Sequence, residues 1–173
     1  SNRVIIEPMV QNLREINCSV LGDYEGLEAS VCEEPIRASG LLTFDDKYAA
    51  GRSTKGMQGA KRRIPADIPA TLASTIQDLA RRAFSAVQAS GVARIDFLFD
   101  ESTNRVYVNE INTIPGSIAF YLWKHSGLSF TNLIDKLIRL ALKRDRETNQ
   151  LTSTHPTNIL SMGGKGGSKT QDR

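Results

Sequence analysis

The sequence predicts an α+β fold in which an antiparallel sheet is flanked by helices. Three observations lead to this prediction. Short β-branched runs separated by turn-forming residues occupy positions 4–32, two amphipathic helical patterns follow, and a strand–turn–strand pattern lies between those helices. With 173 residues, 40% of them hydrophobic, the chain is long enough for one sizeable core and at most two small domains.

The individual elements follow in chain order. Strands are expected at residues 4–10, 15–21 and 27–32, arranged as a meander. Residues 40–67 are rich in Gly, Ser, Lys and Arg, and a loop of that length is usually a functional lid or a disordered segment. Pro69 opens a helix with apolar residues every three or four positions, ending near Ser90-Gly91. A hairpin of residues 92–99 and 105–111 and a last helix at about 131–144 complete the pattern.

Composition narrows the functional classes. The net charge of +3, from 22 basic and 19 acidic residues, is too small to indicate nucleic-acid binding. Cys18 and Cys32 have no zinc-site spacing, so we expect two reduced, buried thiols and a cytoplasmic protein. No apolar run approaches the ~20 residues of a membrane span, and no secretory signal pattern is present, so a soluble protein is expected.

The predicted hairpin carries two polar pairs. Side chains alternate between the faces of a strand, so Arg94 and Asp96 share one face, as do Glu110 and Asn112. A turn centred on Thr103 would place Asp96 opposite Glu110 and Arg94 opposite Asn112. Two carboxylates, an amide and a guanidinium would then converge on one patch.

Two interpretations of this patch are open. On most hairpins, such residues form a solvated face with modest ion pairs, and spacing alone favours that view. However, facing carboxylates destabilise a ladder unless a cation compensates them, and Mg²⁺ is suited to such oxygen ligands. Two ions bridged by one carboxylate could clamp a phosphoryl group, with Arg94 adding positive charge. The Pro115-Gly116 turn directly after Asn112 favours this second interpretation, since exposed amides there could hold an oxyanion.

These residues also carry a resemblance to a known family. Arg94-Ile95-Asp96, followed by the run from Asn109 through Glu110, Asn112 and Pro115 to Gly116, resembles the metal-binding signature of D-alanine–D-alanine ligases, which are ATP-grasp enzymes. The resemblance covers about residues 5–141 and implies the C-terminal subdomain of the ATP-grasp fold. It implies ATP and two Mg²⁺ ions, with Mn²⁺ as an alternative. The implied metal ligands are Asp96, Glu110 and Asn112, while Arg94 and the Gly116 backbone would stabilise the tetrahedral intermediate.

The resemblance extends to a nucleotide site. Residues 6–10 resemble the strand and hinge that meet adenine, which makes Glu7 a candidate, and Glu15 resembles the ribose contact. Lys47 and Tyr48 resemble the start of the mobile loop that closes over the phosphates. Without the family context, Glu15 reads equally as an exposed strand carboxylate, and Lys47 reads better as one more solvated lysine.

The implied activity is ADP-forming ligation of two D-alanines through an acyl phosphate, a step in peptidoglycan synthesis. The family's N-terminal substrate domain and the first half of its ATP-grasp domain have no counterpart here. We therefore expect a fragment, inactive alone, whose partners are D-alanine and the missing N-terminal half. A homodimer is one state open to the full enzyme, and neither nucleic acid nor membrane is expected. Residues 1–145 would form the C-terminal part of the ATP-grasp domain, and residues 146–173 a flexible polar, glycine-rich tail.

Alternatives stay open. Tyr121 stands where many family members place a Ser that helps to fix the second substrate's carboxylate, so another ATP-grasp carboxylate–amine ligase fits as well. A non-catalytic nucleotide-binding or basic interaction module, using Lys61, Arg62, Arg63 and the tail, is a further candidate. The intact set of implied metal ligands argues against a module without catalysis.

Overall fold

A computed structural model describes residues 4–10, 12–36 and 62–150 of the chain. The chain divides into two units, Ser1–Ala141 and Leu142–Arg173, and the first contains the sheet. The order of strands and helices along the chain confirms the predicted α+β class. The elements are β1 (Leu13–Asp23), β2 (Gly26–Pro35), β3 (Arg62–Arg63), α2 (Ala70–Ala86), β4 (Gly91–Asp100), β5 (Arg105–Asn112), the 3-10 helix η2 (Gly116–Ala119), α3 (Phe120–His125) and α4 (Phe130–Gln150).

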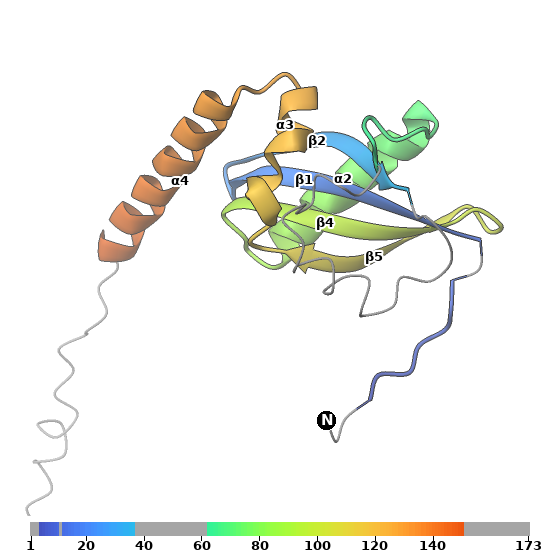
Figure 1. Ribbon diagram of the computed structural model, residues 1–173. Helices are drawn as coiled ribbons and strands as arrows, with labels where there is room; N and C mark the ends of the chain where they lie inside the picture. The colour runs from blue at the N-terminus through green and yellow to red at the C-terminus, as the bar shows by residue number, and fades with distance from the viewer. Residues whose placement is uncertain (1–3, 11, 37–61, 151–173) are drawn as a thin grey trace, which may run out of the picture. The chain divides into compact units, whose positions relative to one another are not determined.

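The strands form one five-stranded sheet in the order β3-β2-β1-β4-β5, with antiparallel neighbours throughout. Figure 1 shows α2 behind this sheet and α3 in front of it. Because side chains alternate along each strand, the two faces have different chemistry. The face toward α2 is apolar, whereas the face toward α3 carries the polar residues of the hairpin.

The core between α2 and the sheet is built from residues spaced to match each element. Helix α2 contributes one apolar stripe, in which Ile76, Ala80 and Phe84 recur at intervals of four and are buried. Strand β4 contributes Ala93, Ile95, Phe97 and Phe99 from alternate positions, and β1 contributes Ile16, Cys18 and Val20. Arg94 and Asp96, which lie between these apolar residues, are thereby turned to the opposite face.

A second, smaller core anchors α3 on the other face. Trp123 is 2% exposed and packs with Leu21, Ala119, Leu122 and Leu133. Its indole nitrogen donates a hydrogen bond to Ser19 Oγ at 3.1 Å, so the polar edge of the ring is satisfied as well. This packing holds α3 against the face that carries Arg94 and Asp96.

Several boundaries differ from those predicted. Residues 4–10 form no strand, since a strand needs a pairing partner and Ile5 and Ile6 are 87% and 93% exposed. The last helix continues past the predicted end at Arg144 to Gln150, and residues 151–173 lie outside the described part. Strand β3, η2 and α3 have no counterpart in the prediction, because they are too short to produce a periodic pattern.

Candidate functional site

The hairpin of β4 and β5 pairs Asp96 with Glu110 and Arg94 with Asn112, as predicted. The register that produces these pairs differs from the predicted one, which assumed a regular hairpin with its turn centred on Thr103. Near the turn, Asp100 pairs with Arg105 and Phe97 with Val108, so the turn is centred between Ser102 and Thr103 rather than on Thr103. A bulge at Asn109 then shifts the register between Asp96 and Phe97.

This bulge decides which face Glu110 occupies. Without it, Asp96 would face Asn109, and Glu110 would point toward the α2 core. The apolar residues of β5 carry a signal for the irregularity. Val106 and Val108 are separated by two positions but Val108 and Ile111 by three, so the alternation slips by one residue at Asn109.

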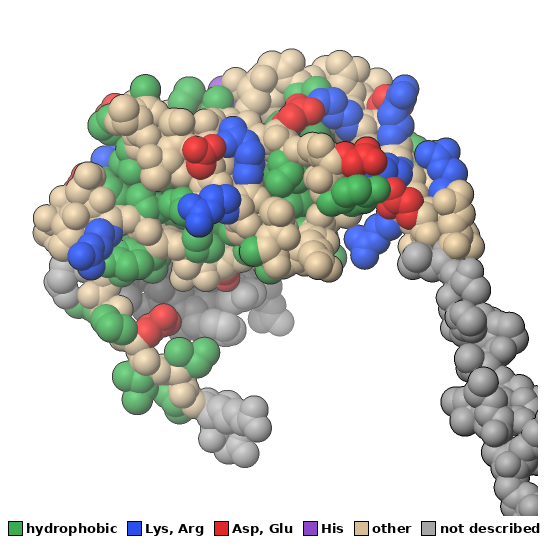
Figure 2. All heavy atoms as spheres, turned by 180° about the vertical axis from the view of Figure 1, so that it is seen from behind, with side chains coloured by type: hydrophobic (Ala, Val, Ile, Leu, Met, Phe, Trp, Pro, Cys, Tyr) green, Lys and Arg blue, Asp and Glu red, His purple; other side chains and the backbone are tan. Residues whose placement is uncertain are grey.

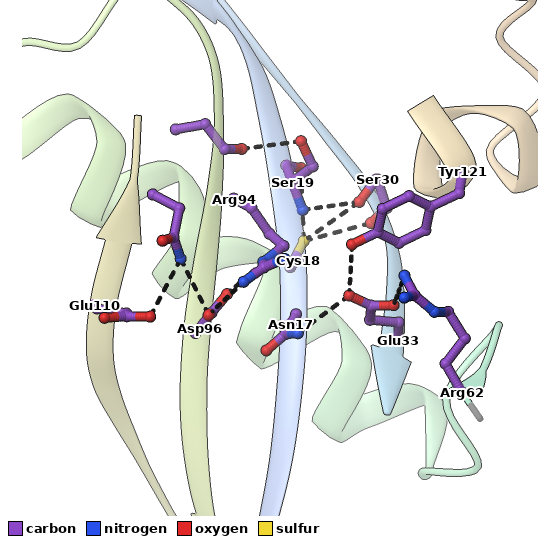
Figure 3. Close-up of polar contacts among 12 residues, drawn as sticks. Asn17, Cys18, Ser19, Ser30, Glu33, Arg62, Arg94, Asp96, Glu110 and Tyr121 are labelled. Atoms are coloured by element: carbon purple, nitrogen blue, oxygen red, sulfur yellow. Dashed lines mark hydrogen bonds and ion pairs between the residues drawn. The ribbon is translucent and has the colours of Figure 1, made fainter. Parts of the chain in front are cut away.

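The register across the whole sheet aligns four polar side chains in one row. Glu33 on β2 lies opposite Asn17 on β1, Asn17 lies opposite Asp96 on β4, and Asp96 lies opposite Glu110 on β5. Figure 3 shows these residues on neighbouring strands of one sheet face. Three carboxylates in one lateral row need compensating cations or donors, since like charges across a ladder repel.

Arg94 compensates Asp96. Its Nε donates to Asp96 Oδ1 and its Nη2 to Asp96 Oδ2, both at 2.7 Å. The side chains are only 18% and 15% exposed, so this is a bidentate, half-desolvated pair. The amide nitrogen of Asn112 also donates to Asp96 Oδ2 at 3.0 Å and to Glu110 Oε1 at 3.5 Å.

The ionisation of the pair reflects its burial. Burial raises the pKa of Asp96, the Arg94 guanidinium opposes that rise, and the charge of Glu110 adds to it, so the net pKa lies above its ordinary value. Burial also acts to lower the pKa of Arg94, but its bonds to Asp96 outweigh this and the net shift is upward. At Asp96, the effect of burial on the pKa therefore outweighs that of its hydrogen bonds.

The other predicted residues have different positions. Glu15 is half-buried on β1 and shares the polar face with Asn17, whereas Glu7 is exposed in the irregular segment 4–10. Gly116 opens η2 directly after Pro115, just beyond the end of β5. Lys47 and Tyr48 lie outside the described residues.

A buried network that the sequence reasoning missed adjoins the predicted set. Glu33 is 2% exposed and accepts hydrogen bonds from Tyr121 Oη at 2.8 Å and Asn17 Nδ2 at 3.1 Å. Arg62 Nη1 lies 3.4 Å from Glu33 Oε2, and its guanidinium stacks 4.5 Å from the centre of the Tyr121 ring. The sequence did contain a signal for this network. The acidic doublet Glu33-Glu34 and the basic doublet at positions 62–63 have complementary charges, which suits neighbouring antiparallel strands.

These contacts argue against the basic interaction surface that the sequence suggested, because its arginines are paired within the protein. Arg62 and Arg63 belong to β3 and contact Glu33 and Glu34. Figure 2, which views the molecule from behind, shows Lys and Arg side chains interspersed with Asp and Glu on that face rather than gathered in a patch. Lys61 and the tail lie outside the described residues.

The donor set suits a hard divalent cation. Two carboxylates and an amide meet at the end of the hairpin, and Mg²⁺ prefers such oxygen ligands. No group of three His, Cys, Asp or Glu side chains suited to a metal is found anywhere in the described part, so the third donor here is the amide of Asn112. The observation that supports the fit is that Asp96 and Glu110 face one another across the ladder, where like charges repel unless a cation compensates them. Asn112 presents its NH₂ group to both carboxylates, whereas binding a metal would use its oxygen.

Comparison with known proteins identifies the family. The family model described as "D-ala D-ala ligase C-terminus" matches residues 1–139. The chain belongs to the D-alanine–D-alanine ligase family. A D-alanine–D-alanine ligase of Thermosipho melanesiensis is 37% identical over 161 residues, which are 93% of this chain and 42% of that protein. The chain thus spans less than half the length of this curated relative.

Solved structures of D-alanine ligases share the fold. The D-alanine–D-alanine ligase from Coxiella burnetii matches with a TM-score of 0.65 and 35% identity, over 83% of this chain and 35% of that one. The VanG D-Ala:D-Ser ligase from Enterococcus faecalis matches with a TM-score of 0.58 and 31% identity, over 73% of this chain and 36% of that one. The five-stranded sheet and its helices are therefore the C-terminal part of an ATP-grasp fold. No helix in the described part is long and apolar enough to cross a membrane.

Proposed function

We propose that this chain supplies the metal- and phosphate-binding half of a ligase that joins two D-alanines at the expense of ATP, for peptidoglycan precursors. The observation that carries the proposal is the convergence of Arg94, Asp96, Glu110 and Asn112 on one face of the hairpin. In the reaction, a carboxylate oxygen of the first D-alanine attacks the γ-phosphorus and ADP leaves. The amine of the second D-alanine then attacks the acyl phosphate, and inorganic phosphate leaves.

The roles of the hairpin residues follow from their charges. Asp96, Glu110 and Asn112 would hold Mg²⁺, which, when bound, neutralises phosphate charge and orients the transferred group. Arg94 supplies a positive charge that no accessible pH removes, beside the place where negative charge develops. The exposed backbone at Gly116, just beyond β5, is suited to donate to the same oxyanion.

We place the nucleotide on the same face of the sheet. Glu15 extends the polar row by one step along β1, which supports its role at the ribose hydroxyls. Glu7, Lys47 and Tyr48 remain proposed contacts to the adenine and phosphates on the strength of the family resemblance. Cys18 and Cys32 face one another across β1 and β2 as free thiols, which supports a cytoplasmic site of action.

The second substrate is the least determined part of the proposal. Tyr121 reaches the polar face from α3, and its hydroxyl is bonded to Glu33 rather than open to a ligand. A ligase that joins D-alanine to another amino or hydroxy acid is therefore the second candidate. The family includes a D-Ala:D-Ser ligase of 31% identity. D-alanine, D-serine and D-lactate as second substrates distinguish the two candidates.

The test is phosphate release from ATP with D-alanine and Mg²⁺. It is measured for the 173-residue chain alone and for a complete ligase, in which the portion that its relatives carry in addition is supplied. We expect turnover only from the complete ligase, because ATP and both substrates must be held in one closed, water-poor site.

Two matched variants test whether the hairpin carboxylates are required for turnover. Glu110→Gln should abolish turnover of the complete ligase, because it removes a proposed metal-bridging charge without changing volume. Glu101→Gln removes an exposed carboxylate from the turn of the same hairpin and should leave turnover unchanged. D-alanine-dependent turnover by the chain alone, or full activity of Glu110→Gln at saturating Mg²⁺, would show that the catalytic groups are misassigned.

A further inference from the structure

The two cysteines of the chain take no part in the proposed reaction, yet they stand directly opposite one another. Cys18 on β1 and Cys32 on β2 are ladder partners, and both are free thiols. Both side chains belong to the core between the sheet and α2, at 0% and 3% exposure. A small apolar side chain at either position would fill the core equally well but could not be oxidised.

The spacing of the ladder suits a disulfide between these two residues. Directly opposed residues of antiparallel strands have Cα atoms about 4.5–5.5 Å apart, inside the range of about 4.4–6.8 Å that a disulfide spans. Their Cβ atoms are about 4.5–5.5 Å apart, whereas a disulfide holds them at roughly 3.5–4.5 Å. Joining Cys18 to Cys32 therefore requires the two strands to approach by on the order of 1 Å, without a change of register.

An irregularity in the ladder lies directly beside the pair. The register shifts between Cys18 and Val20, where Ser30 and Val31 of β2 stand opposite Ser19 alone. The Ser19 amide donates to the Ser30 hydroxyl at 2.9 Å, so a side chain takes the place of a backbone acceptor here. Because a bulge disrupts the regular ladder, the strands are not held at a fixed spacing on this side of the cysteines.

The hydrogen bonds of the two thiols are long. Cys18 Sγ donates to the Ser30 carbonyl at 3.5 Å, and Figure 3 shows its sulfur directed at Ser30. Cys32 Sγ lies 4.0 Å from the carbonyl oxygen of Ala73, in the first turn of α2. A thiol is a weak donor, so loss of these contacts on oxidation costs little.

Cys32 is the thiol that an oxidant reaches first. Strand β1 lies between β2 and β4, whereas β3 pairs with the last two residues of β2 and ends short of Cys32. Cys32 is covered by the connection that carries Ala66, whose amide donates to the Cys32 carbonyl at 2.8 Å, and by the first turn of α2. A local opening of this cover exposes Cys32 while β1 stays in place. The contact between the thiols also lowers the pKa of Cys32 and raises that of Cys18, which favours Cys32 as the first nucleophile.

We propose that Cys18 and Cys32 are a redox-sensitive pair, which a low-molecular-weight disulfide oxidises to a disulfide between β1 and β2. The Cys32 thiolate attacks one sulfur of the small disulfide and releases a first small thiol. The Cys18 thiolate then attacks the Cys32 sulfur of this mixed disulfide and releases the second. The protein thereby gives up two electrons and two protons, and the small disulfide becomes two thiols.

This disulfide acts on the polar row of the sheet. Asn17 and Glu33 adjoin the two cysteines in the chain and are themselves ladder partners, and Asn17 lies opposite Asp96. Closing the strands at the cysteines therefore displaces the row that contains Asp96. Because misplacement of a catalytic group by about 1 Å can cost roughly 100-fold in rate, we expect kcat of the complete ligase to fall at least about tenfold on oxidation and to recover on reduction. This consequence rests on the proposed function.

Oxidised glutathione tests the thiol chemistry on the 173-residue chain without a measurement of activity. The folded chain should lose both titratable thiols and the mass of two hydrogens, remain a monomer, and yield one peptide pair joined through Cys18 and Cys32. The Cys18→Ala variant should stop at a glutathione adduct on Cys32, because the second thiol is missing. In Cys32→Ala, the remaining thiol should react at least about tenfold more slowly, because it lies in the middle of the sheet.

The chain unfolded in urea sets the time scale of this reaction. Two free thiols in the folded chain after about a hundred times the exposure that the unfolded chain needs would overturn the proposal. That limit excludes reaction through global unfolding, which populates roughly one molecule in a thousand or fewer. A lasting glutathione adduct on the wild-type chain, or a disulfide-linked dimer, would overturn it as well. Should either variant fail to fold, these outcomes for the wild-type chain decide the question.

The complete ligase tests the consequence for turnover. We measure kcat for the reduced enzyme, after oxidised glutathione, and again after dithiothreitol. The matched control is the double variant Cys18→Ala with Cys32→Ala, whose kcat should not respond to either reagent. A reduced ligase without activity would overturn the proposed function, while the result on the 173-residue chain still decides the thiol chemistry. A disulfide that forms but leaves kcat within about twofold of the reduced enzyme would overturn the role of the pair as a switch.

Discussion

Replacing Glu110 by Gln should stabilise the isolated chain at neutral pH. Glu110 is exposed and lies directly opposite Asp96, whose pKa is raised by burial and further by the charge of Glu110. Directly opposed like charges on a ladder destabilise it by roughly 0.2–1 kcal/mol. Because Glu110 is screened by solvent, we expect a gain of about 0.5 kcal/mol at low salt. For a unit of this size, that corresponds to a rise in Tm of roughly 1–3 °C.

The pH dependence of this gain has a defined sign. Asp96 binds its proton more tightly in the folded than in the unfolded chain, so stability is lost as pH rises through the window just above the ordinary aspartate pKa. Glu110→Gln removes one cause of the raised Asp96 pKa, and so narrows the pH range over which stability is lost. The difference in stability between variant and wild type should therefore grow as pH rises through this window, and vanish below it, where Asp96 is protonated and no longer repels a second carboxylate.

The assay is thermal unfolding at several pH values in low salt and in about 1 M salt, where the Debye length falls to ~3 Å and the gain should shrink. Glu101→Gln is the control, because Glu101 accepts from Arg14 Nη1 at 3.1 Å and its loss should slightly destabilise the chain. If both variants lower Tm, Glu110 does not repel Asp96 and the charge argument for a cation site is wrong.

Two other expectations concern the same hairpin. Mg²⁺ at ten times its Kd should stabilise the wild-type chain by about 1.4 kcal/mol, and the same concentration should affect Glu110→Gln far less; equal Tm shifts would contradict the assigned ligands. Phe97→Ala should lower the free energy of unfolding by about 3–5 kcal/mol, since Phe97 is fully buried beneath α2. Its ladder partner Val108 is 45% exposed, so Val108→Ala should cost well under about 1 kcal/mol; urea unfolding measures both losses, and losses of similar size would contradict the difference in burial between the two side chains.

The amino-acid sequence determined the elements whose patterns are local. Helix α2 and strand β4 were predictable because their apolar residues repeat with the period of a helix or a strand. The pairing of Asp96 with Glu110 was predicted correctly, although from a turn centre that the structure does not share. Residues 4–10 were predicted as a strand from their β-branched residues and the turn-forming residues that follow, and no strand partner exists for them within the described part.

Only the tertiary structure decided the surroundings of Arg94. The bulge at Asn109 arises because Val106 and Ile111, which are an odd number of positions apart, both pack against the core, and it moves Glu110 onto the polar face. The Tyr121–Glu33 bond joins residues 88 positions apart, and no local period encodes such a contact. It depends on the left-handed turn before α3 and on the packing of Trp123 against β1. Local sequence patterns therefore specify which side chains share a strand face, whereas the contacts between distant segments decide which of them meet.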